Sequence, residues 1–390
     1  MKPATERLHH LDALRALAMV LILPVHALGL IGIRDGWNDV EASIFWVLHA
    51  FRMPLFFMIA GFFGARMVEV RGGAGLLRNR AVQIGVPLVL GTIFVVPLLT
   101  VCTHAVSGEA GGPGSSGLLA TLAALEPSYL WFLWYLVLFY ATSLAGRRAL
   151  SRRGVVVERA RSAGGRLLAN PIAPLLLAIP TALLLYWQPT WIVETTPAKS
   201  FVPVPELLAF YGIFFLAGWM LFATPGLREA IESRPRRYAL LASLTLPPAL
   251  ALYLLQGNPA VGEGRFFHIL ALLLLCAATW STVLGLLGLS RHYLGDYSPR
   301  MRYWADASYW IYLSHFLPMA ALALVLTNFA MPWSVRVALL SSATLTLIYF
   351  AYSTFVRHSV VGRVLHGPRP RRARARMALT PPKVAAAPPA

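Results

Sequence analysis

The chain has 390 residues, of which 57% are hydrophobic and only 13% are charged. A soluble protein would carry about 25% charged residues. The apolar residues also come in blocks of about 20, long enough to cross a hydrocarbon core of about 30 Å. The composition excludes a soluble globular protein and predicts an all-α, polytopic integral membrane protein.

Ten apolar blocks are long enough to form membrane helices. In chain order they are 11–33, 44–65, 83–106, 129–146, 171–188, 205–224, 239–256, 266–288, 304–326 and 334–357. We find no internal repeat and no separate soluble domain. We therefore predict one membrane domain over residues 1–366, followed by a disordered, basic, Pro/Ala-rich tail over residues 367–390.

The net charge of +18 is placed asymmetrically along these blocks. With the N-terminus inside, Arg15 and Arg52 lie well within spans, and only four basic residues lie in outer loops or at the outer ends of spans: Arg34, Lys199, Arg265 and Arg336. The other 28 of the 34 Lys and Arg residues are internal, and the inner segment 147–168 is predicted to form an amphipathic surface helix. This excess of positive charge predicts a cytoplasmic N-terminus and C-terminus in the bacterial cytoplasmic (inner) membrane. We therefore expect this positive charge to interact with the lipid bilayer, and not with nucleic acid.

The first span carries the most informative pair of residues, Arg15 and His26. Eleven residues make about three helical turns, which puts both side chains on one face roughly 16 Å apart. Pro24 is expected to kink the helix beside His26, and Asp12 can pair with Arg15. Ionisable groups within a membrane helix are costly, so we predict proton transfer at His26 and anion binding near Arg15. The structural alternatives are an Arg15 that anchors the helix by snorkelling and a His26 hydrogen-bonded to a neighbouring helix for packing.

The second span adds His49 and Arg52 at a depth close to that of His26. An arginine at this depth needs a partner or a water-filled cavity. We predict that these three groups converge at one site. The structural alternative is neutralisation of Arg52 by an acidic residue such as Glu206.

Two further spans carry candidate acceptor-binding residues. Aromatic faces stack on sugar rings and a carboxylate accepts hydrogen bonds from hydroxyls, which suggests a sugar platform at the start of the fourth span: Glu126, Trp131, Trp134 and Tyr135. The alternative is an aromatic anchor at the membrane interface. His315 in the ninth span is a further polar residue, with structural and functional roles equally open.

Four motifs occur in order and cover nearly the whole chain. They are Leu11–Ala16 with the Arg-x10-His spacing, Phe51–Phe63, Leu130–Tyr135 and Ala307–His315. On these motifs the chain resembles the membrane-bound acyltransferase family 3, and within it the glucan biosynthesis protein C branch, which is associated with succinylation of periplasmic glucans.

The resemblance implies roles for individual residues. His26 takes the position of the proposed catalytic base, and Arg15 that of an essential arginine. Arg78 and Arg80 follow the second span, where the family carries basic residues associated with the acyl-CoA donor. Relatives commonly have arginine where this chain has Gln83, and histidine where it has Tyr129.

The residue types suit acyl transfer to a hydroxyl. Histidine can take the hydroxyl proton near neutral pH. Arg52, or His49 as second choice, can stabilise the oxyanion. Arg78 and Arg80 can hold coenzyme A phosphates, although both also fit ordinary positive-inside charge. No metal motif occurs, so we expect no metal and no permanently bound cofactor, with acyl-CoA as co-substrate.

The leading interpretation is an integral-membrane O-acyltransferase. It would move an acetyl or succinyl group from acyl-CoA to a hydroxyl of a glycan or other extracytoplasmic acceptor, with enzymes of glycan synthesis as further partners. The alternative is a transporter or flippase for a glycan or acylated substrate. A third interpretation is a structural membrane partner of a glycan-synthesis complex.

Overall fold

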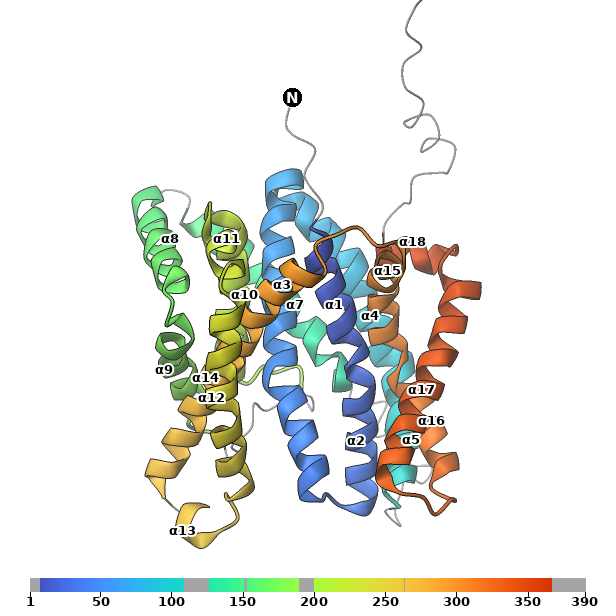
Figure 1. Ribbon diagram of the computed structural model, residues 1–390. Helices are drawn as coiled ribbons and strands as arrows, with labels where there is room; N and C mark the ends of the chain where they lie inside the picture. The colour runs from blue at the N-terminus through green and yellow to red at the C-terminus, as the bar shows by residue number, and fades with distance from the viewer. Residues whose placement is uncertain (1–7, 109–125, 151–152, 189–199, 263, 367–390) are drawn as a thin grey trace, which may run out of the picture.

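The computed structural model describes residues 8–108, 126–150, 153–188, 200–262 and 264–366. These residues form helices and connecting turns, without a strand among them, and most of the helices stand side by side (Figure 1). The helices are α1 (His9–Val20), α2 (Ile22–Asp35), α3 (Asp39–Arg80), η1 (Ala81–Gly85), α4 (Val86–Leu90), η2 (Gly91–Val95), α5 (Val96–Ser107), η3 (Ser128–Leu130), α7 (Trp131–Ala149), α8 (Gly154–Ala169), α9 (Ala173–Leu185), α10 (Pro205–Ala223), α11 (Leu227–Glu232), α12 (Pro235–Leu254), α13 (Pro259–Gly262), α14 (Arg265–Tyr293), α15 (Pro299–Ser314), α16 (Phe316–Leu326), α17 (Trp333–Ala351), η4 (Tyr352–Val356) and α18 (Val360–His366).

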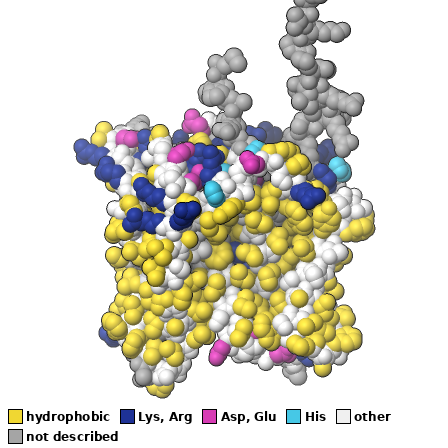
Figure 2. Space-filling model, viewed as in Figure 1, with side chains coloured by type: hydrophobic (Ala, Val, Ile, Leu, Met, Phe, Trp, Pro, Cys, Tyr) yellow, Lys and Arg dark blue, Asp and Glu magenta, His cyan; other side chains and the backbone are white. Residues whose placement is uncertain are grey.

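The surface and the helix lengths are those of an integral membrane protein. Seven helices in the described residues are long and apolar enough to cross a membrane, or up to nine if each of two bent pairs counts as one span. Figure 2 shows an apolar wall, with Lys and Arg gathered mainly at the end where α8, α11 and α18 lie. An outward-facing apolar surface of this extent suits lipid, because water would leave it unfavourably hydrated.

The prediction of ten spans, with both chain ends in the cytoplasm, stays a prediction. One of the seven helices is a 69-residue run, Asp39–Ser107, whose length of about 100 Å far exceeds one crossing. Gly72 interrupts it with φ 71° and ψ 173°, between the predicted spans 44–65 and 83–106. Lys199 and the predicted tail, 367–390, lie outside the described residues.

Three predicted spans are not straight helices. The first is broken at Leu21, three residues before Pro24, as the proline predicts. The ninth bends by 62° between α15 and α16, at His315. The fifth is shorter than predicted: α9 has 13 residues, and Asn170 holds an extended backbone that turns the chain by 115° from α8.

Helices α3 and α10 approach each other closely. A Cβ atom on Gly61 would lie 2.0 Å from the carbonyl oxygen of Phe215. A Cβ atom on Gly218 would lie 1.8 Å from that of Met58. Only glycine fits at either place, so these two residues set the distance between α3 and α10.

Candidate functional site

Four basic side chains from three places in the sequence come together near the middle of the bundle. His26 lies on α2, His49 and Arg52 on α3, and His315 at the bend between α15 and α16. The rings of His26 and His315 have centroids 5.0 Å apart. Arg52 interacts electrostatically with all three imidazoles. The structure therefore brings the predicted trio together and adds His315, which the sequence placed separately.

Arg52 is a buried cation to which none of the described residues gives an acidic partner. Its side chain donates from Nη1 to the carbonyl oxygen of Leu21 at 3.4 Å, the residue at which α1 and α2 separate. Its Nε is buried and has no hydrogen-bond partner in the part of the chain that the structure describes, and the residue is only 3% exposed. Among the described residues, no carboxylate lies within ion-pair distance of Arg52, so the alternative of neutralisation by Glu206 has no support. A desolvated charge of this kind favours an anionic ligand.

His26 presents a free imidazole to this cluster. It is half-buried, and its ring packs against Phe316 with centroids 4.4 Å apart. Neither ring nitrogen hydrogen-bonds to any residue that the structure describes. The alternative of a histidine tied to a neighbouring helix for packing therefore has no support, and the ring is available to a substrate.

His49 and two tyrosines complete the surroundings of Arg52. His49 donates from Nδ1 to the carbonyl oxygen of Phe45 at 3.0 Å, which leaves Nε2 as an acceptor in the neutral ring. Tyr211 on α10 and Tyr312 on α15 both interact electrostatically with Arg52. The site thus combines one fixed positive charge with several neutral groups that can give or take a hydrogen bond.

Tyr129 has a structural role at the bend. Its hydroxyl donates to the carbonyl oxygen of Leu313 at 2.8 Å. In return, the hydroxyl of Tyr312 donates to the carbonyl oxygen of Tyr129 at 2.8 Å. These reciprocal bonds tie η3, which precedes α7, to the last turn of α15, directly before His315.

Arg15 lies nearer the end of the bundle where α1 begins, and it is partnered. Its Nη2 is 3.4 Å from Asp12 and donates to the carbonyl oxygen of Ala305 at 3.1 Å. The side chain is 35% exposed and lies over the ring of Phe63 at 6.0 Å. The predicted pairing with Asp12 is confirmed. The Ala305 contact also fixes α1 to α15, while a role of Arg15 in anion binding stays a prediction.

The two predicted donor-binding arginines differ in their surroundings. Arg80 is half-buried, stacks on the ring of Tyr140 at 4.9 Å and faces a groove of about 540 Å³. Most of the residues lining this groove are apolar: Leu77, Ala81, Gly85, Val86, Val89, Leu90 and Val137, beside Arg80 and Tyr140. Arg78 is exposed. Arg80 is therefore the better placed of the two to hold a bound molecule.

The predicted sugar platform is largely packed into the protein. Trp131 and Tyr135 are buried, with ring centroids 5.4 Å and 6.3 Å from that of Tyr211. Trp134 donates from Nε1 to the carbonyl oxygen of Phe201 at 2.9 Å, and Glu126 is half-buried. Trp131 and Tyr135 are thus not interfacial anchors, and acceptor binding by these four residues stays a prediction.

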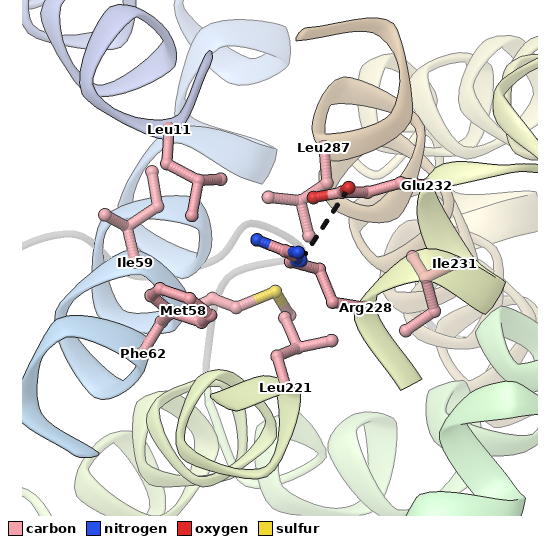
Figure 3. A pocket seen from close by; sticks show the side chains of 9 residues that line it. All are labelled: Leu11, Met58, Ile59, Phe62, Leu221, Arg228, Ile231, Glu232 and Leu287. Carbon is pink, nitrogen blue, oxygen red and sulfur yellow. Dashed lines mark ion pairs between the residues drawn. The ribbon is translucent and has the colours of Figure 1, made fainter. Parts of the chain in front are cut away.

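A second polar cluster, at the end where α1 begins, was not predicted. His10 donates from Nε2 to Glu232 at 2.9 Å, and both side chains are buried. Arg228 lies 3.9 Å from the same carboxylate and points into a small, mainly apolar cavity that also has Leu11 and Leu287 in its wall (Figure 3). Arg228 also hydrogen-bonds Glu229 at 2.6 Å, and this bond holds the pKa of Glu229 below its ordinary value. No sequence spacing signals the cluster, because His10 and Glu232 are 222 residues apart.

Comparison with known proteins gives a consistent assignment. The model of an acyltransferase domain matches residues 8–353. Glucans biosynthesis protein C of Escherichia coli K12 is 26% identical over 328 residues, which cover 80% of this chain and 81% of the relative. The same protein from Escherichia coli O157:H7 has the same identity and coverage. No solved structure gives a significant match. With the domain match spanning nearly the whole chain and apolar helices throughout, the chain belongs to this acyltransferase family and is a membrane acyltransferase.

Proposed function

We propose that this protein transfers an acetyl or succinyl group from cytoplasmic acyl-CoA to a hydroxyl of a glycan or other extracytoplasmic acceptor. The observation that carries the proposal is the free imidazole of His26 beside the uncompensated charge of Arg52. The family supports acyl transfer, and the name of the relatives points to a glucan as acceptor. A bacterial inner membrane and contact with enzymes of glycan synthesis belong to the same proposal.

His26 acts as the general base in this reaction. The acceptor O–H gives its proton to a ring nitrogen of His26 while the oxygen forms a bond to the thioester carbon. The tetrahedral intermediate then collapses, the C–S bond breaks, and the sulfur of coenzyme A takes the proton back from the imidazolium. The ester and free coenzyme A are the products, and no acyl-enzyme is required.

Arg52 supplies the positive charge that the intermediate needs. The carbonyl oxygen of the thioester becomes an oxyanion when the hydroxyl adds, and a desolvated guanidinium stabilises that charge strongly. His49 is the second candidate for this task. If the donor is succinyl-CoA, Arg52 can instead bind the free carboxylate of the acyl group, and His49 is then left to stabilise the oxyanion.

Coenzyme A approaches from the end of the bundle that carries most of the basic residues. Arg80, with its apolar groove, is the main candidate for a phosphate contact. Arg78 can add a weaker, screened attraction at the surface. Arg15 then lies on the same side as the donor, where its half-buried guanidinium can meet a further anionic group.

The test is transfer of a labelled acyl group in proteoliposomes that contain the purified protein. Acetyl-CoA and succinyl-CoA are supplied separately with a neutral glucan, and mass spectrometry of the glucan identifies the group that was added. We expect one donor to label the glucan and His26→Ala to abolish labelling, with at least a ~1,000-fold loss of rate. The matched control is His104→Ala, which removes a histidine from α5, a helix that carries none of the four cluster residues.

Two results would contradict the proposal. Full transfer by His26→Ala would exclude His26 as the base. Glucan uptake into the vesicles without consumption of either acyl-CoA would instead favour a transporter.

A further inference from the structure

His315 is held in one orientation at the bend between α15 and α16. It is 0% exposed, and the ring of Phe316 lies nearly parallel to it with centroids 5.9 Å apart. The hydrogen bonds between Tyr129 and the last turn of α15 fix the backbone immediately before it. The position of this imidazole is therefore set before any substrate binds.

The backbone also fixes the tautomer of His315. Its Nδ1 lies 3.0 Å from the carbonyl oxygen of Ile311 and 2.8 Å from that of Tyr312. Carbonyl oxygens only accept hydrogen bonds, so Nδ1 carries the proton and Nε2 carries the lone pair. Nε2 is buried and has no hydrogen-bond partner among the described residues. A buried acceptor left without a donor is costly, so a nearby group that can turn a donor towards this nitrogen should pair with it.

His26 is in position to provide that donor. Its ring centroid lies 5.0 Å from that of His315, with an angle of 53° between the ring planes. The nitrogens lie on the rims of the two rings, so a modest rotation of the half-buried His26 ring can bring an N–H to Nε2 of His315. No other hydrogen bond in the described residues opposes this rotation, because His26 forms none.

We propose that His315 is the positioning residue for His26. This inference rests on the proposed function, in which His26 is the base. Nε2 of His315 accepts a hydrogen bond from the N–H of His26, which selects one tautomer and leaves the other His26 nitrogen bare towards the acceptor hydroxyl. When that nitrogen takes the hydroxyl proton, the same hydrogen bond stabilises the imidazolium. His315 itself neither gains nor loses a proton.

The first test separates the acceptor nitrogen from the bulk of the side chain. His315→Phe keeps a planar ring without an acceptor, and His315→Gln places an amide oxygen near the position of Nε2. We expect His315→Phe to lower kcat about 100-fold with the KM for acyl-CoA unchanged, and His315→Gln to recover at least ten-fold of that loss. Both variants must elute and melt like the parent protein. Full kcat in His315→Phe, or a folded His315→Gln as slow as His315→Phe, would overturn the proposal.

The second test does not depend on activity. Nitrogen NMR of the reconstituted protein, with ring-labelled histidine, reports which nitrogen of each imidazole carries a proton, and His26→Gln identifies the His26 signals. We expect one His26 tautomer in the parent and in His315→Gln, and a mixture of both in His315→Phe. His26 signals that do not change in His315→Phe would overturn the pairing. If the pairing is present but the parent transfers no acyl group, the proposed function fails and the pair of imidazoles remains.

Discussion

The two polar clusters of the bundle contain similar residues and differ in one respect. At the end where α1 begins, His10 and Arg228 share the carboxylate of Glu232. In the middle, Arg52 interacts electrostatically with His26 and His315, and no acid lies within ion-pair distance of it among the described residues. In the first cluster the charges and hydrogen-bonding groups compensate one another, and the cluster ties α1 to α11. The second lacks negative charge, and this deficit is what identifies it as the place for a substrate.

The physical reason lies in the cost of burying charge. A cation taken out of water costs several kcal/mol unless a counterion or a set of hydrogen bonds replaces its hydration. At Glu232 the chain supplies that compensation itself. At Arg52 it comes only in part, from one carbonyl oxygen at 3.4 Å, so an anionic ligand or intermediate gains the remainder.

Loss of the central charge should have the largest effect. We expect Arg52→Met to lower kcat by a factor of about 100 to 1,000, because the oxyanion loses its main stabilising charge while the apolar side chain still fills the site. Initial rates of acyl transfer in proteoliposomes measure this. A variant that keeps more than half the parent rate would show that the charge of Arg52 is not used in the reaction. The lack of an acidic partner would then not identify the central cluster as the substrate site.

Loss of Glu232, the acid shared by His10 and Arg228, should lower the stability of the protein and leave the rate of acyl transfer unchanged. Because Glu232→Leu leaves the buried ring of His10 without its hydrogen-bond partner, while Arg228 keeps its bond to Glu229, we expect a destabilisation of about 2 kcal/mol. Unfolding in mild detergent measures it, with Glu229→Leu as the control because that neighbouring carboxylate is largely exposed. The double variant His10→Leu with Glu232→Leu should recover part of the loss. A large fall in kcat of folded Glu232→Leu would place this cluster in the reaction.

The donor side should show the smallest effects. We expect Arg80→Ala to raise the KM for acyl-CoA about ten-fold with little change in kcat, because a charge-assisted phosphate contact is lost before the chemical step. Arg78→Ala should change the KM less than two-fold, since an exposed charge is screened. If both variants had the same KM for acyl-CoA, the difference in burial between Arg80 and Arg78 would have no bearing on donor binding.

The sequence identified the residues whose depth in a span could be read from their position. Arg15, His26 and Arg52 stand out because ionisable groups are rare in apolar blocks, and the break at Leu21 follows from Pro24. The family likewise follows from motifs with fixed local spacing.

What could not be predicted depends on contacts between distant segments. The pair of His10 and Glu232 forms only because α11 packs beside α1. The free acceptor on His315 follows from a bend that Tyr129, on another helix, holds in place. Trp131 and Tyr135 are buried by α10, which their own segment cannot indicate.

The central claim is that the reacting thioester lies between His26 and Arg52. The most direct measurement is a structure of the reconstituted protein bound to a ketone analogue of the acyl-CoA donor, in which a methylene group between the sulfur and the carbonyl prevents acyl transfer. The account predicts the acyl carbon next to the His26 ring, with Arg52 against its oxygen and the coenzyme A phosphates near Arg80. An analogue bound elsewhere, in contact with neither His26 nor Arg52, would contradict the account.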